Sequence, residues 1–185
     1  MPITINGSGT ILGISVGGLQ DGIITQAELA QPFTSDIAKA STSGTAIDFT
    51  GIPSWAKRIT VMLAGVSTNG TSPLLFQLGT SGGFQTTGYT TANTRIGASA
   101  VIAASSTAGW SINSATAASN SSGIITFTLV NGVGLWVGEG TIASSEPAVS
   151  WTSGNKDLAG VLDRVRITTV SANTFDAGTI NILYE

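Results

Sequence analysis

The chain has 185 residues, a length typical of one globular domain with an appendage, and only 9% of its residues are charged. A cytosolic monomer normally carries about 25% charged residues, so we expect that much of the surface is buried against copies of the chain, that the protein acts outside a cell, or both. The net charge of −3 and the lack of a Lys/Arg cluster argue against nucleic-acid binding. The chain contains no cysteine and no histidine, which excludes disulfides, zinc–thiolate sites, Ser-His-Asp triads and Cys-His dyads.

The N-terminal part differs from the rest. Residues 1–22 alternate apolar and small polar residues with frequent glycines, which indicates short extended segments and tight turns. The chain begins without the cationic stretch of a signal peptide, and no apolar run approaches the ~20 residues of a membrane-spanning helix. Residues 24–40 have helix-like content that Pro32 would end, and an extended connector is the alternative. We therefore predict that residues 1–40 form a separate N-terminal segment and connector, and that the chain does not insert into a membrane.

From residue 41 onward the pattern is that of β-strands, rich in Ile, Val, Thr and Phe and bounded by Gly, Asn, Ser and Pro. About nine strands without helical stretches between them predict an all-β domain over residues 41–185, an antiparallel β-sandwich or jelly roll. The predicted strands cover residues 46–50, 58–66, 74–79, 95–103, 124–131, 134–143, 148–151, 163–170 and 174–184.

Carboxylates are the remaining candidates for catalysis. A glycosidase needs two carboxyl groups about 5 to 10 Å apart, and the formal candidates are Glu139, Glu146, Asp157 and Asp163. They lie in separate predicted loops and strand ends and share no motif, so we interpret them as solvated turn residues. The sequence thus predicts a protein that is not an enzyme, with no catalytic residues, metal site or cofactor.

Aromatic side chains are the best candidates for ligand binding, since flat apolar rings with a polar edge can stack on pyranose sugars. The alternative is that a tryptophan packs in the core or at an interface, and we favour it for Trp55 and Trp136, which lie within strand patterns. Trp110 lies in a Ser/Ala-rich stretch and Tyr89 in the sequence TTGYTT, so we expect both to be exposed. The predicted saccharide-binding residues are Trp110, Tyr89, Phe84 and Trp151. Candidate binding loops are residues 65–73, 81–93, 104–123 and 144–156.

Three blocks of the sequence resemble tail-fibre and tail proteins of tailed bacteriophages: MPITINGSGTILGISVGGLQDG, SGTAIDFTGIPSWAKRITVMLAGVSTNGTSPLLFQLG and FDAGTINILYE. The resemblance weakens over residues 82–123 and 143–158. It implies a short, homotrimeric tail fibre of the receptor-binding type, assembled in the host cytoplasm and acting outside the cell as part of the virion. Residues 1–40 would join the baseplate or another tail protein. The β domain would adsorb to a bacterial surface saccharide, such as lipopolysaccharide, without cleaving it.

Two other functions stay open at this point. A structural tail or decoration protein would bind only other virion proteins, and its isolated chain would not adsorb to cells. A monomeric lectin-like module would have no use for a docking segment such as residues 1–40. The low charge favours an oligomer, because obligate interfaces resemble a divided protein core, and clustering of sites in a trimer would strengthen weak saccharide binding.

Overall fold

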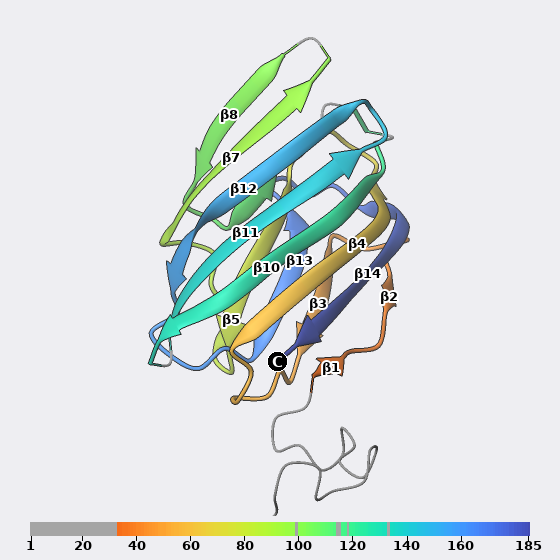
Figure 1. Cartoon of the computed structure of the whole chain (residues 1–185). Coiled ribbons are helices and arrows are strands. Elements are labelled where there is room, and N and C mark those ends of the chain that lie inside the picture. The colour runs from red at the N-terminus through yellow and green to blue at the C-terminus, as the bar shows by residue number, and fades with distance from the viewer. Residues whose placement is uncertain (1–32, 99, 114–115, 118, 133) are drawn as a thin grey trace, which may run out of the picture. The chain divides into compact units, whose positions relative to one another are not determined.

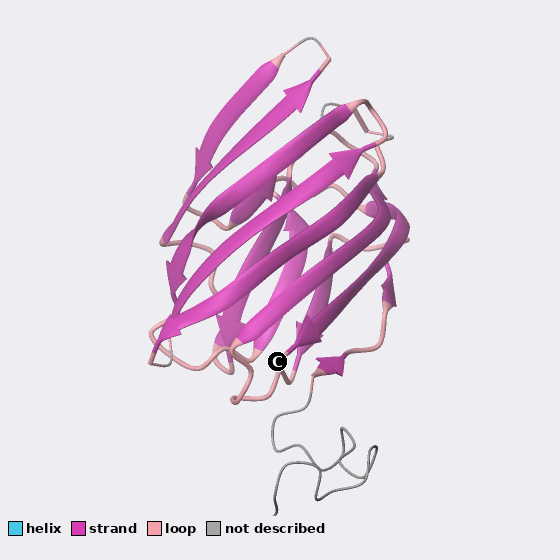
Figure 2. Ribbon diagram, viewed as in Figure 1, coloured by secondary structure: helices cyan, strands magenta, loops and turns pink. Residues whose placement is uncertain are grey.

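The computed structural model describes residues 33–185 except 99, 114–115, 118 and 133, and in this part of the chain every regular element is a β-strand (Figures 1 and 2). All strand pairs are antiparallel, and two sheets pack together as a β-sandwich. The predicted all-β fold is therefore confirmed. The helix considered for residues 24–40 does not form in the described residues 33–40, where the chain makes two short strands; residues 24–32 lie outside the described residues.

The larger sheet has nine strands in the order β1-β14-β4-β10-β11-β12-β7-β8, with β2 also paired to β14. Its strands are β1 (Thr34–Ser35), β2 (Lys39–Ala40), β4 (Arg58–Thr68), β7 (Tyr89–Gly97), β8 (Val101–Ser106), β10 (Ser121–Asn131), β11 (Leu135–Ser144), β12 (Ala148–Asp157) and β14 (Phe175–Tyr184). The five-stranded sheet has the order β3-β13-β5-β6, with β9 also paired to β5. Its strands are β3 (Ala46–Thr50), β5 (Leu74–Thr80), β6 (Gly83–Phe84), β9 (Trp110–Ile112) and β13 (Arg164–Thr169).

The hydrophobic core lies between the two sheets and follows the alternation of the sequence. Along β4, Ile59, Val61 and Leu63 are buried, while the residues between them face outward. Because successive side chains of a strand point to opposite faces, this alternation fixes which face of the sheet packs inward. The same reasoning applies to β10, where Ile125 and Phe127 are buried.

The N-terminal boundary of the sandwich differs from the predicted one at residue 40. Strand β1 pairs with the end of β14, and β2 pairs with its middle, so residues 34–40 belong to the large sheet. The compact unit accordingly begins at Phe33. Residues 1–32 of the predicted attachment segment lie outside the described residues.

The region predicted as one strand over residues 95–103 is instead a hairpin. Strand β7 ends at Gly97 and β8 begins at Val101, and the Gly97 N–H donates to the carbonyl oxygen of Ala100 across the turn (2.9 Å). Both halves have strand-like composition, and no proline marks the reversal, so the sequence pattern does not reveal it. The hairpin places β8 at the free edge of the nine-stranded sheet (Figure 1).

Candidate functional site

Two of the four aromatic residues predicted to bind a ligand are part of the core. Trp110 is 0% exposed and Tyr89 is 2% exposed, so the expectation that both are exposed is wrong. The reason for Trp110 is that β9 pairs with β5, which returns the Ser/Ala-rich stretch to the interior. Its ring packs edge-on against Phe127 (centroids 4.7 Å apart) and Tyr89 (5.3 Å), and its indole N–H donates to the carbonyl oxygen of Gly138 (3.1 Å).

Tyr89 joins the beginning of β7 to the five-stranded sheet. Its hydroxyl donates to the carbonyl oxygen of Gln85 (2.8 Å) and accepts the backbone N–H of Leu78 (2.9 Å). Burial raises the pKa of this phenol far above its usual range, with the hydrogen bond from Leu78 opposing the rise. The residue therefore supports the fold rather than contacting a ligand.

Phe84, the third predicted residue, lies on the outer side of the five-stranded sheet. Its ring is covered by the guanidinium group of Arg166, 4.1 Å from the ring centroid, and lies 5.7 Å from that of Arg164. Arg166 in turn makes two hydrogen bonds to Asp48 (2.8 and 2.7 Å), which raise the pKa of the guanidinium group. The ring face is thus occupied by the protein's own cation.

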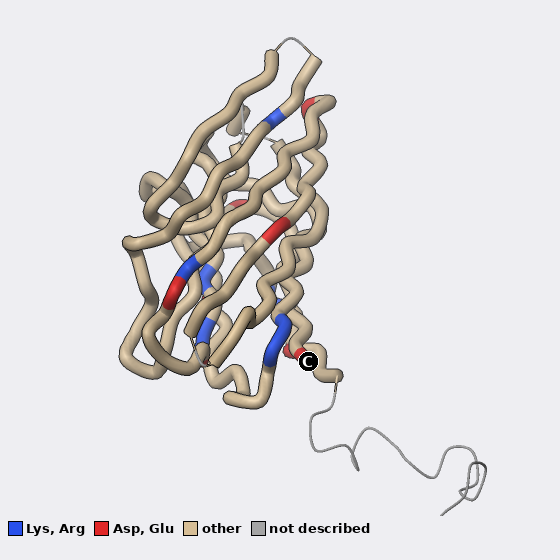
Figure 3. Tube along the Cα trace, turned by 60° about the vertical axis from the view of Figure 1, so that its left-hand side comes forward, with Lys and Arg blue, Asp and Glu red and all other residues tan. Residues whose placement is uncertain are grey.

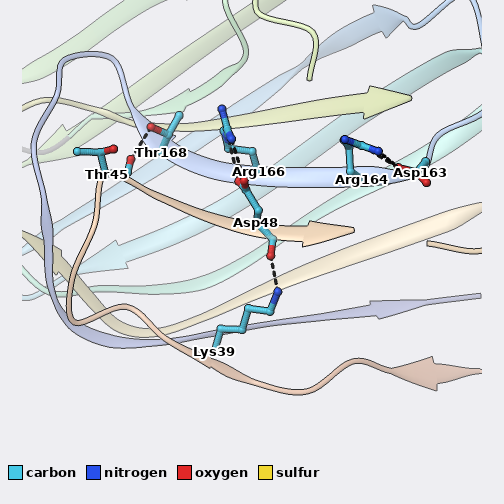
Figure 4. A network of polar contacts seen from close by, with 7 residues as sticks. All are labelled: Lys39, Thr45, Asp48, Asp163, Arg164, Arg166 and Thr168. Carbon is cyan, nitrogen blue, oxygen red and sulfur yellow. Dashed lines mark hydrogen bonds and ion pairs between the residues drawn. The ribbon is translucent and has the colours of Figure 1, made fainter. Parts of the chain in front are cut away.

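Figure 4 shows that the charges around this cation are satisfied within the protein. Lys39 donates to the backbone carbonyl oxygen of Asp48, and Arg164 donates through Nε to Asp163 (2.7 Å). Thr168 donates to the carbonyl oxygen of Thr45 (2.7 Å). These contacts tie β2, β3 and β13 together, and we interpret the cluster as structural.

Trp151, the fourth predicted residue, lies in a different environment. It is 45% exposed on the outer face of β12, where it lines a shallow hollow of about 720 Å³ formed across β7, β10, β11 and β12. The register places Thr94 directly opposite it on β7 and Thr141 directly opposite it on β11, with Ile124 opposite Thr141 on β10. One cross-strand row therefore carries an indole ring between two threonines.

A second cross-strand row forms the rest of the hollow. Glu139 of β11 lies opposite Ser153 of β12 and Thr126 of β10, and Ala92 of β7 lies opposite Ser153. Short side chains surround the taller Trp151 and Glu139, which explains why the face is hollowed there. The hollow lies on strands and not on loops, although three of the predicted binding loops, residues 81–93, 104–123 and 144–156, each contribute residues to its lining. Residues 148–156 of the last predicted loop form most of β12.

The hollow carries one negative charge and no positive charge. All seven Lys and Arg residues of the chain are described, and none lines the hollow. Arg95 of β7 and Lys156 of β12 are on adjacent strands but are buried, and Arg95 is paired with Glu146 (2.8 Å). Figure 3 shows how sparse the charged positions are along the described part of the chain.

The four carboxylates considered for catalysis do not come together in the hollow. Glu139 is the only one that lines it. Glu146 pairs with Arg95, Asp163 pairs with Arg164, and Asp157 accepts the backbone N–H of Ala159 (2.8 Å). Within the described residues, no group of three or more His, Cys, Asp or Glu side chains is placed to hold a metal ion.

Sequence reasoning pointed to Trp151 and missed its neighbours. Glu139 was interpreted as a turn residue, yet it lies within β11 between Gly138 and Gly140. The alternation of β11 is the signal that could have placed it on the outer face, because the buried Trp136 lies three residues earlier and the buried Ile142 three residues later. The pairing that brings it near Trp151 is not contained in that pattern.

No protein-family model, curated protein or solved structure matches this chain. Among the described residues there is no helix long and apolar enough to cross a membrane.

Proposed function

We propose that the chain is a homotrimeric tail-fibre protein of a tailed bacteriophage that binds a bacterial surface saccharide through the hollow around Trp151 without cleaving it. The observation that carries the binding function is the half-exposed Trp151 between Thr94 and Thr141 on the outer face of the nine-stranded sheet. The sequence resemblance supports the assignment to a phage tail, in which the segment before the sandwich joins the virion.

The hollow has the chemistry that a saccharide needs. An indole ring offers a flat apolar face to the C–H face of a pyranose. Around it, Thr94, Thr141 and Ser153 supply hydroxyl groups and Glu139 supplies a carboxylate, which are the donors and acceptors that match sugar hydroxyls. The volume of about 720 Å³ is within the range of small-molecule sites, and the shallow form leaves room for a polymer to continue on either side.

The carboxylate content favours binding over hydrolysis. Glycoside hydrolases of the common type use two carboxyl groups on either side of the scissile bond. The lining of the hollow contains Glu139 and no second carboxylate. A sugar stacked on Trp151 would therefore meet one acceptor but not the acid and base pair that cleavage requires.

Strand β8 supports the oligomeric part of the proposal. Its residues Val101–Ser106 contain no charge and no proline, and both faces of the strand are exposed apart from a half-buried Ser106. β8 pairs with β7 on one side only, and an uncharged strand with a free outer edge is a template for pairing with another chain. The opposite edge, in contrast, is covered by the two short strands β1 and β2. We propose that the β8 edge takes part in the contact between copies, and substitution of Ile102 by lysine should lower the solution mass from three chains to one.

The binding function is tested with the full chain and a panel of fluorescent bacterial polysaccharides and whole Gram-negative and Gram-positive cells. Substitution Trp151→Thr keeps a β-branched residue on β12 and removes the ring, so we expect at least a roughly 10-fold loss of affinity. The matched control is Val149→Thr, on the same face of the same strand but outside the hollow. Equal binding by wild type and Trp151→Thr would overturn the assignment of the site.

The competing function is a structural tail or decoration protein. The exposed edge of β8 favours it, because the same edge could pair with a different virion protein. If the wild-type protein binds no polysaccharide and no cell in the panel, the structural function replaces the adsorption function. A monomer that binds saccharide would instead indicate a lectin-like module.

A further inference from the structure

We infer that the hollow around Trp151 selects saccharides without acidic groups, and that Glu139 is the residue that determines this selectivity. The inference rests on the proposed saccharide-binding function and specifies its ligand class. The favoured ligand is a sugar unit that presents hydrogen-bond donors, a hydroxyl pair or an ammonium group, next to the face stacked on the indole.

Glu139 differs from every other described carboxylate in having no partner. Within residues 33–185 as described, each other Asp and Glu side chain takes part in a hydrogen bond or ion pair, and Glu139 takes part in none. It is nevertheless an exposed charge in the middle of a sheet face, where glutamate is a poor strand former. The fold does not use this carboxylate, so it is free to accept donors from a ligand.

The register sets the distance between the carboxylate and the ring. Trp151 lies opposite Thr141, and Ser153 lies opposite Glu139, so Trp151 and Glu139 are diagonal neighbours on β12 and β11. Diagonal neighbours of an antiparallel pair are about 7–8 Å apart, within reach of long side chains. A sugar ring stacked on the indole therefore has its edge substituents beside the carboxylate.

Because the lining of the hollow contains no cation, the contact between the sugar and Glu139 should favour neutral or cationic groups over anionic ones. Hydroxyl or ammonium donors make charge-assisted hydrogen bonds to a carboxylate. A uronate, sialate or phosphate group in the same place would meet an unpaired like charge, with no Lys or Arg in the lining to compensate it. Arg58 is the one cation on this face of the described sheet, and it lies opposite Thr128, beyond the hollow, and is paired with Glu185.

The test uses the full chain with sets of polysaccharides that differ only in charge. Each uronic-acid polysaccharide is paired with its carboxyl-reduced derivative, which has the same sugar stereochemistry without the charge. A second comparison separates hydroxyl from ammonium donors, using neutral glucans against amine-bearing glucans and chitosan oligosaccharides. We expect wild type to bind the reduced form at least about 10-fold more tightly than the acidic form at low salt. Glu139→Gln, which keeps the shape, should narrow that ratio to within about 3-fold and weaken binding of the preferred ligand by about 10-fold.

The control variant is Asp36→Asn, which makes the same change in net charge in the connection between β1 and β2, away from the hollow. It should leave the ratio of the two affinities unchanged. The inference is overturned if wild type binds acidic polysaccharides and their reduced forms with equal affinity. It is also overturned if Glu139→Gln leaves the ratio of these two affinities unchanged. If Trp151→Thr still abolishes binding in those cases, the saccharide-binding function stands and only the selectivity is lost. If no saccharide of any charge binds wild type, both are overturned.

Discussion

On the inner side of the nine-stranded sheet the ring of Trp110 is fully buried against Phe127, whereas on the outer side the ring of Trp151 is half exposed among threonines and serines. Consecutive residues of β11 lie in these two environments, Gly138 on the inner side and Glu139 on the outer side. A Cβ atom at Gly138 would lie 2.5 Å from the Phe127 ring, so only glycine fits the inner side, while the next residue, Glu139, stands free on the outer side. The face of the sheet on which an aromatic residue lies, and not the type of residue, therefore separates the structural aromatics from the binding candidate.

The largest expected effect on stability is that of Trp110→Ala. It removes a fully buried ring, leaves a cavity beside Phe127 and Tyr89, and takes the donor from the Gly138 carbonyl. We expect the free energy of unfolding to fall by about 3–5 kcal/mol, measured by denaturant unfolding at pH 7. A loss below about 1 kcal/mol would contradict the placement of this ring in the core.

A smaller effect, with a pH signature, is expected for Tyr89→Phe. Loss of the hydroxyl leaves the buried N–H of Leu78 without its acceptor, at a cost of about 1–3 kcal/mol at pH 7. Burial raises the pKa of the folded phenol above the value of about 10 that applies in the unfolded chain. Above pH 10 the unfolded state therefore releases a proton that the folded state keeps, and stability falls as the pH rises.

The measurement that isolates this effect is the slope of the free energy of unfolding between pH 9.5 and 11. In Tyr89→Phe the free energy of unfolding should fall less steeply with pH, because the phenol that titrates differently in the folded and unfolded states is gone. The matched control is Tyr184→Phe, the other tyrosine of the chain, which is only partly buried against the core. An unchanged slope in Tyr89→Phe, or an equal change in both variants, would contradict the role of burial.

The sequence predicted the fold class and most strands but not the site, and β4, β7 and β9 show why. Alternating apolar residues over 58–66 predict β4 and its buried face, because that pattern is local. The burial of Tyr89 and Trp110 depends on β7 pairing with β12 and β9 pairing with β5, which are contacts between residues far apart in the chain. Local polarity around these aromatics pointed the other way.

The same limit applies to the hollow. Trp151 was among the predicted binding residues, but its neighbours come from β7, β10 and β11 as well as from β12. A hollow built from cross-strand rows is fixed by register, and a shift of one residue would move Glu139 to the inner side. No sequence motif marks such a site, because saccharide binding requires no fixed sequence spacing between the residues that line it.

The smallest expected effect on stability is that of Trp151→Thr, and it is the prediction that most sharply separates the two sides of the sheet. The substitution keeps a good strand former at an exposed position and loses only cross-strand contacts with Thr94 and Thr141, worth about 0.2–1 kcal/mol. Denaturant unfolding should therefore give a loss of at most about 1 kcal/mol, close to that of Val149→Thr. A loss as large as that of Trp110→Ala would mean that the ring is buried in the assembled protein, against another copy or a partner. In that case the outer face of the sheet would be an interface, and the hollow would not be open to a saccharide.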